Sequence, residues 1–119
     1  MIDLLVNDVP AIFLIDTGAS NSCVDLNKVK KFNLKYNSTI ENSSSATGEI
    51  NNSFISYENK ITIGDLIHEN LKLILFDMNY INKSINTFQK IEIDGILGSE
   101  ILVALKAQIN YKNKFILFN

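Results

Sequence analysis

Short apolar runs separated by turn-forming residues are the feature of this 119-residue sequence that most limits its fold. The runs are rich in β-branched and aromatic residues, and they cover 2–6, 9–15, 54–63 and 71–76. Asn7-Asp8 is a hairpin turn signal between the first two runs, while Gly64-Asp65 and His68-Glu69-Asn70 are expected breaks in the later ones. This alternation of short apolar runs and turn-forming residues predicts an all-β protein.

A few segments have apolar residues at helical spacing instead, and a short helix is expected in each: 25–32, 79–90 and 100–106. The first of them begins at Asp25, a residue type that commonly caps a helix N-terminus. The chain closes with a predicted terminal hairpin made of 107–111 and 115–118. Because the sequence shows no internal repeat and no linker, residues 1–119 are expected to form a single β-rich domain.

The charge and hydropathy of the chain argue against nucleic acid as a partner and against a membrane span. The net charge is -2, and all 11 basic residues are lysines, scattered along the chain. The densest group, Lys28, Lys30 and Lys31, is typical of a solvated helix face. No apolar run approaches the roughly 20 residues that span a bilayer, and no signal segment opens the sequence. Localisation stays open, with the cytoplasm favoured unless a leader was removed.

The chain has one cysteine and one histidine, so neither a disulfide nor a metal site is expected. Cys23 has no base nearby in the sequence, which favours a buried structural thiol over a nucleophile. His68 falls in an expected break between strands and is interpreted as a surface residue. No cofactor is expected.

The residues that carry chemistry follow the second apolar run directly, as Asp16-Thr17-Gly18-Ala19-Ser20. A carboxylate placed after a buried strand is unfavourable unless it is used, because burying a lone charge is costly. The threonine hydroxyl can bond nearby backbone, and glycine lets the chain turn sharply close to a ligand. The same triplet is also a fair strand-to-turn sequence, so by itself it is suggestive and no more.

A second motif, Ile96-Leu97-Gly98, is an apolar pair ending in glycine and followed at once by a helical pattern. With both motifs in this order, the chain resembles the retropepsin-like and pepsin-like aspartic proteases over nearly its whole length. The local residues look more like the single-domain bacterial and cellular members than the viral ones. The resemblance implies a closed β-barrel-like domain with short helices, one of them directly after Gly98.

The resemblance also implies roles for single residues. Asp16 matches the catalytic aspartate, and Thr17 matches the residue whose hydroxyl ties two active-site loops together across a dimer. Gly18 matches the glycine whose carbonyl meets substrate backbone, and Ala19 and Ser20 complete the active-site loop. The segment 96–98 matches an apolar support behind that loop, which is structural rather than catalytic.

The polar stretch 41–53 lies where the family has its flap. On composition it is a solvated surface loop, because it is small, polar and poor in core anchors. By position and glycine content alone, Thr47-Gly48 would be the flap tip.

Two positions depart from the viral pattern. Retroviral members usually carry an acidic residue after Asp-Thr-Gly-Ala and an arginine after the second glycine, and the two side chains pair. Here these positions hold Ser20 and Ser99, so both halves of the pair are absent together. The departure puts viral substrate preference and viral dimer geometry in doubt for this chain.

The chemistry of this family needs two carboxylates that share a proton, and this chain has one Asp-Thr-Gly. Asp94-Gly95-Ile96 lacks the threonine and belongs to the other motif. A homodimer would supply the second Asp16 on its twofold axis, with a peptide or protein as substrate and the terminal hairpin 109–118 as the expected interface. Two alternatives are a retropepsin-fold module that no longer cleaves, and half of a larger bilobal enzyme.

Overall fold

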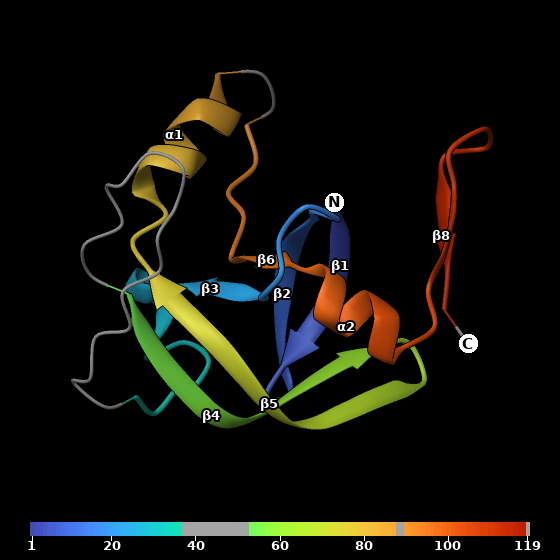
Figure 1. The fold of residues 1–119 in the computed structure, drawn as a ribbon. Helices are drawn as coiled ribbons and strands as arrows, with labels where there is room; N and C mark the ends of the chain where they lie inside the picture. The colour runs from blue at the N-terminus through green and yellow to red at the C-terminus, as the bar shows by residue number, and fades with distance from the viewer. Residues whose placement is uncertain (37–52, 88–89, 119) are drawn as a thin grey trace.

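The computed structural model describes residues 1–36, 53–87 and 90–118. Its elements in chain order are β1 (Ile2–Val6), β2 (Val9–Ile15), β3 (Cys23–Asp25), the 3-10 turn η1 (Leu26–Lys28), β4 (Phe54–Ile63), β5 (Leu66–Phe76), α1 (Asn79–Asn86), β6 (Gly95–Leu97), α2 (Ser99–Ala104), β7 (Gln108–Asn110) and β8 (Phe115–Leu117) (Figure 1).

Strands β1 to β6 close into a barrel in the order β1-β2-β6-β3-β5-β4. The pairs β1–β2 and β4–β5 are antiparallel hairpins, whereas β2–β6 and β3–β5 are parallel. Alternate residues of these strands point inward, so side chains such as Val6, Phe13 and Leu73 are fully buried in one core. The expectation of an all-β closed barrel with short helices is confirmed.

The β1–β2 hairpin turns where the sequence predicted, and its two turn residues explain why. Asn7 and Asp8 have φ of 49° and 70°, the left-handed conformation that Asn and Asp tolerate and that a two-residue hairpin requires. The Asn7 amide also donates to the Phe32 carbonyl at 2.9 Å and to Asn59 Oδ1 at 3.1 Å. One residue therefore forms the turn and fastens it to β4.

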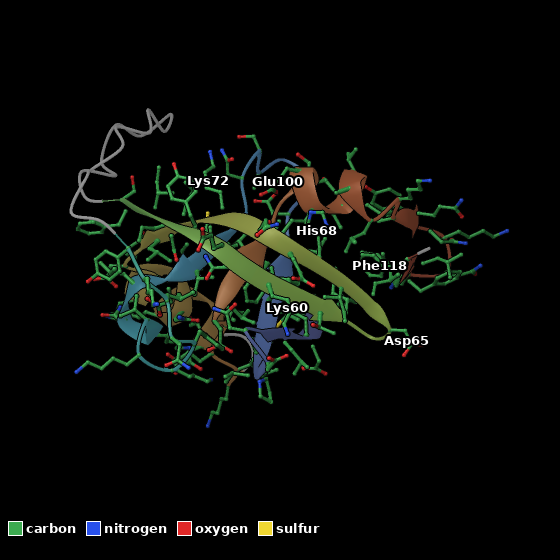
Figure 2. The ribbon with its side chains drawn as sticks, turned by 90° about the horizontal axis from the view of Figure 1, so that it is seen from below. Lys60, Asp65, His68, Lys72, Glu100 and Phe118 are labelled. Carbon is green, nitrogen blue, oxygen red and sulfur yellow. The ribbon has the colours of Figure 1, made fainter. Side chains whose placement is uncertain are left out.

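The expected break at His68-Glu69-Asn70 is wrong, because β5 runs without interruption from Leu66 to Phe76. The β4–β5 ladder shifts register on either side of Asn59, and Glu58 and Asn70 take positive φ there. A bulge of this kind absorbs an irregular stretch without ending the strand. His68 is half-buried within β5, and Asp65 marks the tip of the hairpin (Figure 2).

The predicted helices exist but are shorter than expected. The segment from Asp25 forms only the turn η1, whose first turn is capped by the Asp25 carboxylate accepting from Asn27 N at 3.1 Å. Helix α1 ends at Asn86 rather than 90, and α2 ends at Ala104. The terminal hairpin is confirmed as a separate sheet, β7–β8, which stands beside the barrel (Figure 1).

Candidate active site

The two sequence motifs lie side by side because β2 and β6 pair in parallel. Ile15 is opposite Leu97, and the next amide along, Asp16 N, donates to the Leu97 carbonyl at 3.0 Å. Strand β6 fits between β2 and β3 only because Gly95 has no side chain. A Cβ on Gly95 would lie 2.3 Å from the Cys23 carbonyl and 2.5 Å from the Phe13 ring.

Asp16 is exposed at the point where β2 leaves the barrel, and a tight turn holds its carboxylate. Its Oδ1 accepts from Gly18 N at 2.9 Å, and its carbonyl accepts from Ala19 N at 3.1 Å. Within the described part of the chain, no hydrogen bond is made to its second carboxylate oxygen, Oδ2. Thr17 and Ser20 are exposed on the same turn. One oxygen of Asp16 is thus oriented by the backbone while the other faces solvent.

The second motif supports this turn from behind. Leu97 is fully buried and Ile96 is partly buried, while Ser99 N and Ser99 Oγ both donate to the Ala19 carbonyl, at 2.7 and 3.0 Å. Gly98 permits this approach, since a Cβ there would lie 2.9 Å from the Ala19 carbonyl oxygen. The segment 96–98 therefore packs directly behind the loop that carries Asp16.

The structure adds a charged contact that the sequence reasoning missed. Glu100, in the first turn of α2, accepts from both the backbone N and the hydroxyl of Ser22, which is fully buried. In Figure 2 Glu100 lies at the start of α2, beside the loop that follows β2. An acidic residue directly after Gly98-Ser99 was the available signal, but no local pattern pairs it with Ser22.

Asp94 is a buried carboxylate that serves the barrel. Its side chain accepts from Lys28 Nζ at 2.6 Å and from Ile12 N at 2.9 Å. Burial would raise the pKa of the Asp94 carboxyl, but the hydrogen bonds from Lys28 and Ile12 and the lysine charges outweigh it and lower the pKa. Asp94 is therefore held as a paired anion and does not offer a second exposed carboxylate.

Cys23, on β3, lies beside the same loop. Burial, followed by the negative charges of Glu100 and Asp16, raises the pKa of the Cys23 thiol to about 12. The thiol is therefore protonated at neutral pH and is a poor nucleophile, as expected for a structural cysteine.

The flap tip, metal binding and membrane crossing are features separate from the Asp16 loop. Thr47 and Gly48, the expected flap tip, lie outside the described residues. Across the three described ranges, no group of three or more His, Cys, Asp or Glu residues is placed to hold a metal ion. In the same part of the chain, no helix is both long and apolar enough to cross a membrane.

Comparison with known proteins matches this geometry to one family. The family described as aspartyl protease matches residues 2–101, a span that contains both motifs and the whole barrel. A search of curated protein sequences found no match.

Solved structures share the fold. EIAV protease, in complex with the inhibitor HBY-793, has a TM-score of 0.64 at 20% identity, over 91% of this chain and 88% of that one. The retroviral protease-like domain of Ddi1 from Leishmania major has a TM-score of 0.62 at 12% identity, over 99% and 86%. A retropepsin-like aspartic protease from Rickettsia conorii has a TM-score of 0.57 at 19% identity, over 92% and 73%. The chain belongs to the aspartyl protease family and has the retropepsin fold.

Proposed function

We propose that this protein is an aspartic endopeptidase that is active as a homodimer, with Asp16 of each chain forming the catalytic pair. The observation that carries the proposal is the state of Asp16: its carboxylate is exposed, oriented by Gly18 N, and free at one oxygen within the described residues. A carboxylate held in this way at the end of a buried strand has no evident role in stabilising the barrel. Family membership supports the reading.

The reaction follows from two carboxylates placed about 3 Å apart, which cannot both ionise readily and so share a proton. The charged carboxylate takes a proton from a water molecule as the water oxygen attacks the scissile carbonyl carbon. The protonated carboxyl hydrogen-bonds to the carbonyl oxygen, where negative charge develops. A proton then passes to the leaving nitrogen as the C–N bond breaks. Each chain contributes one Asp-Thr-Gly, so the pair requires two chains.

The residues around Asp16 take supporting roles in this proposal. The exposed Thr17 hydroxyl would bond the partner's active-site loop, and the Gly18 carbonyl would accept from substrate backbone. Ala19 and Ser20 complete the loop, and Thr47-Gly48 would cover the substrate as a flap tip. The substrate would bind as an extended strand, with main-chain hydrogen bonds giving affinity and alternating pockets selecting side chains.

The terminal hairpin, residues 109–118, is the proposed dimer interface. An isolated two-stranded sheet is marginally stable in water, yet this one exposes Tyr111, Phe115 and Leu117 by 77%, 49% and 49%. A groove of about 490 Å³ runs between the hairpin and the β1–β2 end of the barrel, and Ile15, the residue before Asp16, lines it. A second copy placed there would cover the apolar side chains and bring the two Asp16 loops together.

The rival proposal is a retropepsin-fold module that binds peptide or dimerises without cleaving. The exposed carboxylate and the intact Thr17 and Gly18 favour the enzyme, because binding alone has no chemical need for all three.

One comparison separates the two proposals. Wild type and Asp16→Asn are incubated with unfolded casein at mildly acidic pH, and sedimentation reports the oligomeric state of each. We expect a wild-type dimer that cleaves casein and a mutant dimer that does not, since the substitution keeps the shape of the side chain and removes its ability to accept a proton. A wild-type dimer no more active than Asp16→Asn on any substrate would leave the binding module standing.

A further inference from the structure

Both carboxylate oxygens of Glu100 accept hydrogen bonds from Ser22, which lies 78 positions earlier in the chain. Glu100 Oε2 accepts from Ser22 N at 2.5 Å, and Oε1 accepts from Ser22 Oγ at 3.0 Å. Ser22 is fully buried, so its amide and hydroxyl depend on protein partners rather than on bulk solvent. An ionised carboxylate has no proton to give, and the Ser22 hydroxyl must therefore donate to it.

The Ser22 hydroxyl oxygen makes a second contact, with the backbone of the second motif. With its proton committed to Glu100, the Ser22 oxygen accepts from Gly98 N at 2.8 Å. The residues on either side of Gly98 hold the loop that carries Asp16. Leu97 accepts from Asp16 N at 3.0 Å, and Ser99 N donates to the Ala19 carbonyl at 2.7 Å. Glu100 thus anchors the segment that fixes both ends of the Asp16 turn.

We propose that Glu100 is a positioning residue for Asp16, acting through the Ser22 hydroxyl and the Gly98 peptide; the inference rests on the proposed protease function. Charge-assisted hydrogen bonds are stronger and more directional than neutral ones, so this link restrains the loop more than a Ser–amide contact would. The positions expected to carry a charged pair, 20 and 99, hold serines, and the charged link is made instead by Ser22 and Glu100. Glu100 and Asp16 both lie near Cys23, because the negative charge of each raises the pKa of that thiol.

The test measures kcat and KM separately on a peptide substrate for wild type, Glu100→Gln, Ser22→Ala and the double variant. Active sites are counted by titration with a tight-binding inhibitor, so unfolded or monomeric protein does not lower kcat. The matched control is Glu69→Gln, the same substitution at an exposed position on β5.

We expect Glu100→Gln to lower kcat by roughly tenfold or more while KM changes by less than about twofold, because hydrogen bonds to charged groups are among the stronger ones. Glu69→Gln should match wild type. The double variant should be no slower than the slower single variant, since both substitutions cut one link.

Each other outcome counts against the inference. Wild-type kcat in Glu100→Gln or in Ser22→Ala, in a protein that is otherwise active, overturns the positioning role and leaves the protease function intact. The positioning role is also overturned if the fold losses of kcat in Glu100→Gln and Ser22→Ala multiply in the double variant, because the two substitutions would then act independently. A wild type no more active than Asp16→Asn would instead remove the protease function, and the positioning role with it. If Glu100→Gln fails to fold, Ser22→Ala decides alone, because it removes one oxygen and leaves the packing in place.

Discussion

Replacing Asp94 by asparagine should remove one of the largest electrostatic contributions to the stability of the barrel. Asp94 Oδ1 lies 2.6 Å from Lys28 Nζ and 3.4 Å from Lys31 Nζ, and the Asp94 and Lys28 side chains are only 6% and 16% exposed. The variant leaves Lys28 largely buried, with the exposed Glu92 at 3.3 Å and the Ile93 carbonyl at 3.2 Å as its remaining partners. It also places an amide NH₂ against either Lys28 Nζ or Ile12 N, both of which are donors.

Breaking a buried ion pair by removing one partner costs about 3–5 kcal/mol, and the lower end applies here because Lys28 keeps Glu92. A loss of about 3 kcal/mol is a large fraction of the roughly 5–15 kcal/mol that stabilises a typical domain. For a chain of this length it should lower Tm by roughly 10 °C or more. Thermal and urea unfolding at pH 7, followed by circular dichroism, measure both quantities.

The difference in stability between wild type and Asp94→Asn should depend on pH in a definite direction. The pKa of the Asp94 carboxyl is lowered in the folded state, so the stabilisation is fully present above the unfolded value, about 3.9, and is lost as pH falls through the folded value below it. The stability gap between wild type and Asp94→Asn should therefore narrow only at pH below about 4.

Asp8→Asn is the matched control, because Asp8 pairs with Lys60 at 2.8 Å but is 71% exposed. Exposed pairs of this kind contribute little, so no measurable loss of stability is expected. The reasoning is wrong if Asp94→Asn unfolds at the wild-type temperature. It is also wrong if Asp8→Asn loses as much stability as Asp94→Asn, because burial would then not set the strength of these ion pairs.

Two further predictions concern the terminal hairpin and the single cysteine. Phe115→Glu should raise the dimer dissociation constant at least tenfold, about 1.4 kcal/mol, while leaving the barrel folded, because Phe115 is half exposed in the single chain. Sedimentation over a concentration series measures this, and unchanged dimerisation would exclude the hairpin as interface. Cys23 should resist alkylation at pH 8 in the folded protein and react readily in urea, because its pKa is raised to about 12 only in the folded state. Mass spectrometry follows the labelling, and fast reaction without urea would contradict the raised pKa of the Cys23 thiol.

Much of the fold could be predicted because its signals are local. The apolar runs at 2–6 and 9–15 alternate as strands do, and Asn7-Asp8 can adopt the positive φ that closes their hairpin. Asp16 stands next to the end of its strand in the sequence as in space, so its exposed turn was also readable. The resemblance to aspartic proteases rested on these short patterns and on 96–98.

The sequence did not predict correctly where every strand and helix begins and ends. Polar residues 68–70 look like a break, yet β5 continues through them because its outer face meets water and a bulge near Asn59 absorbs the irregular register. Only pairing with β4 decides this. The helix expected from 25–32 likewise shortens to one 3-10 turn.

The long-range contacts of the barrel and of the segment behind Asp16 were decided by the tertiary structure alone. Ser22 and Glu100 are 78 positions apart, and Lys28 and Asp94 are 66 apart. No periodicity connects residues so distant, because their meeting depends on barrel closure, which places β6 between β2 and β3. The sequence by itself determined that an acid follows a buried strand and that glycines flank its support. Which side chains contact the segment behind that acid was settled only when the strands paired, since hydrogen bonds select partners by distance and direction in space.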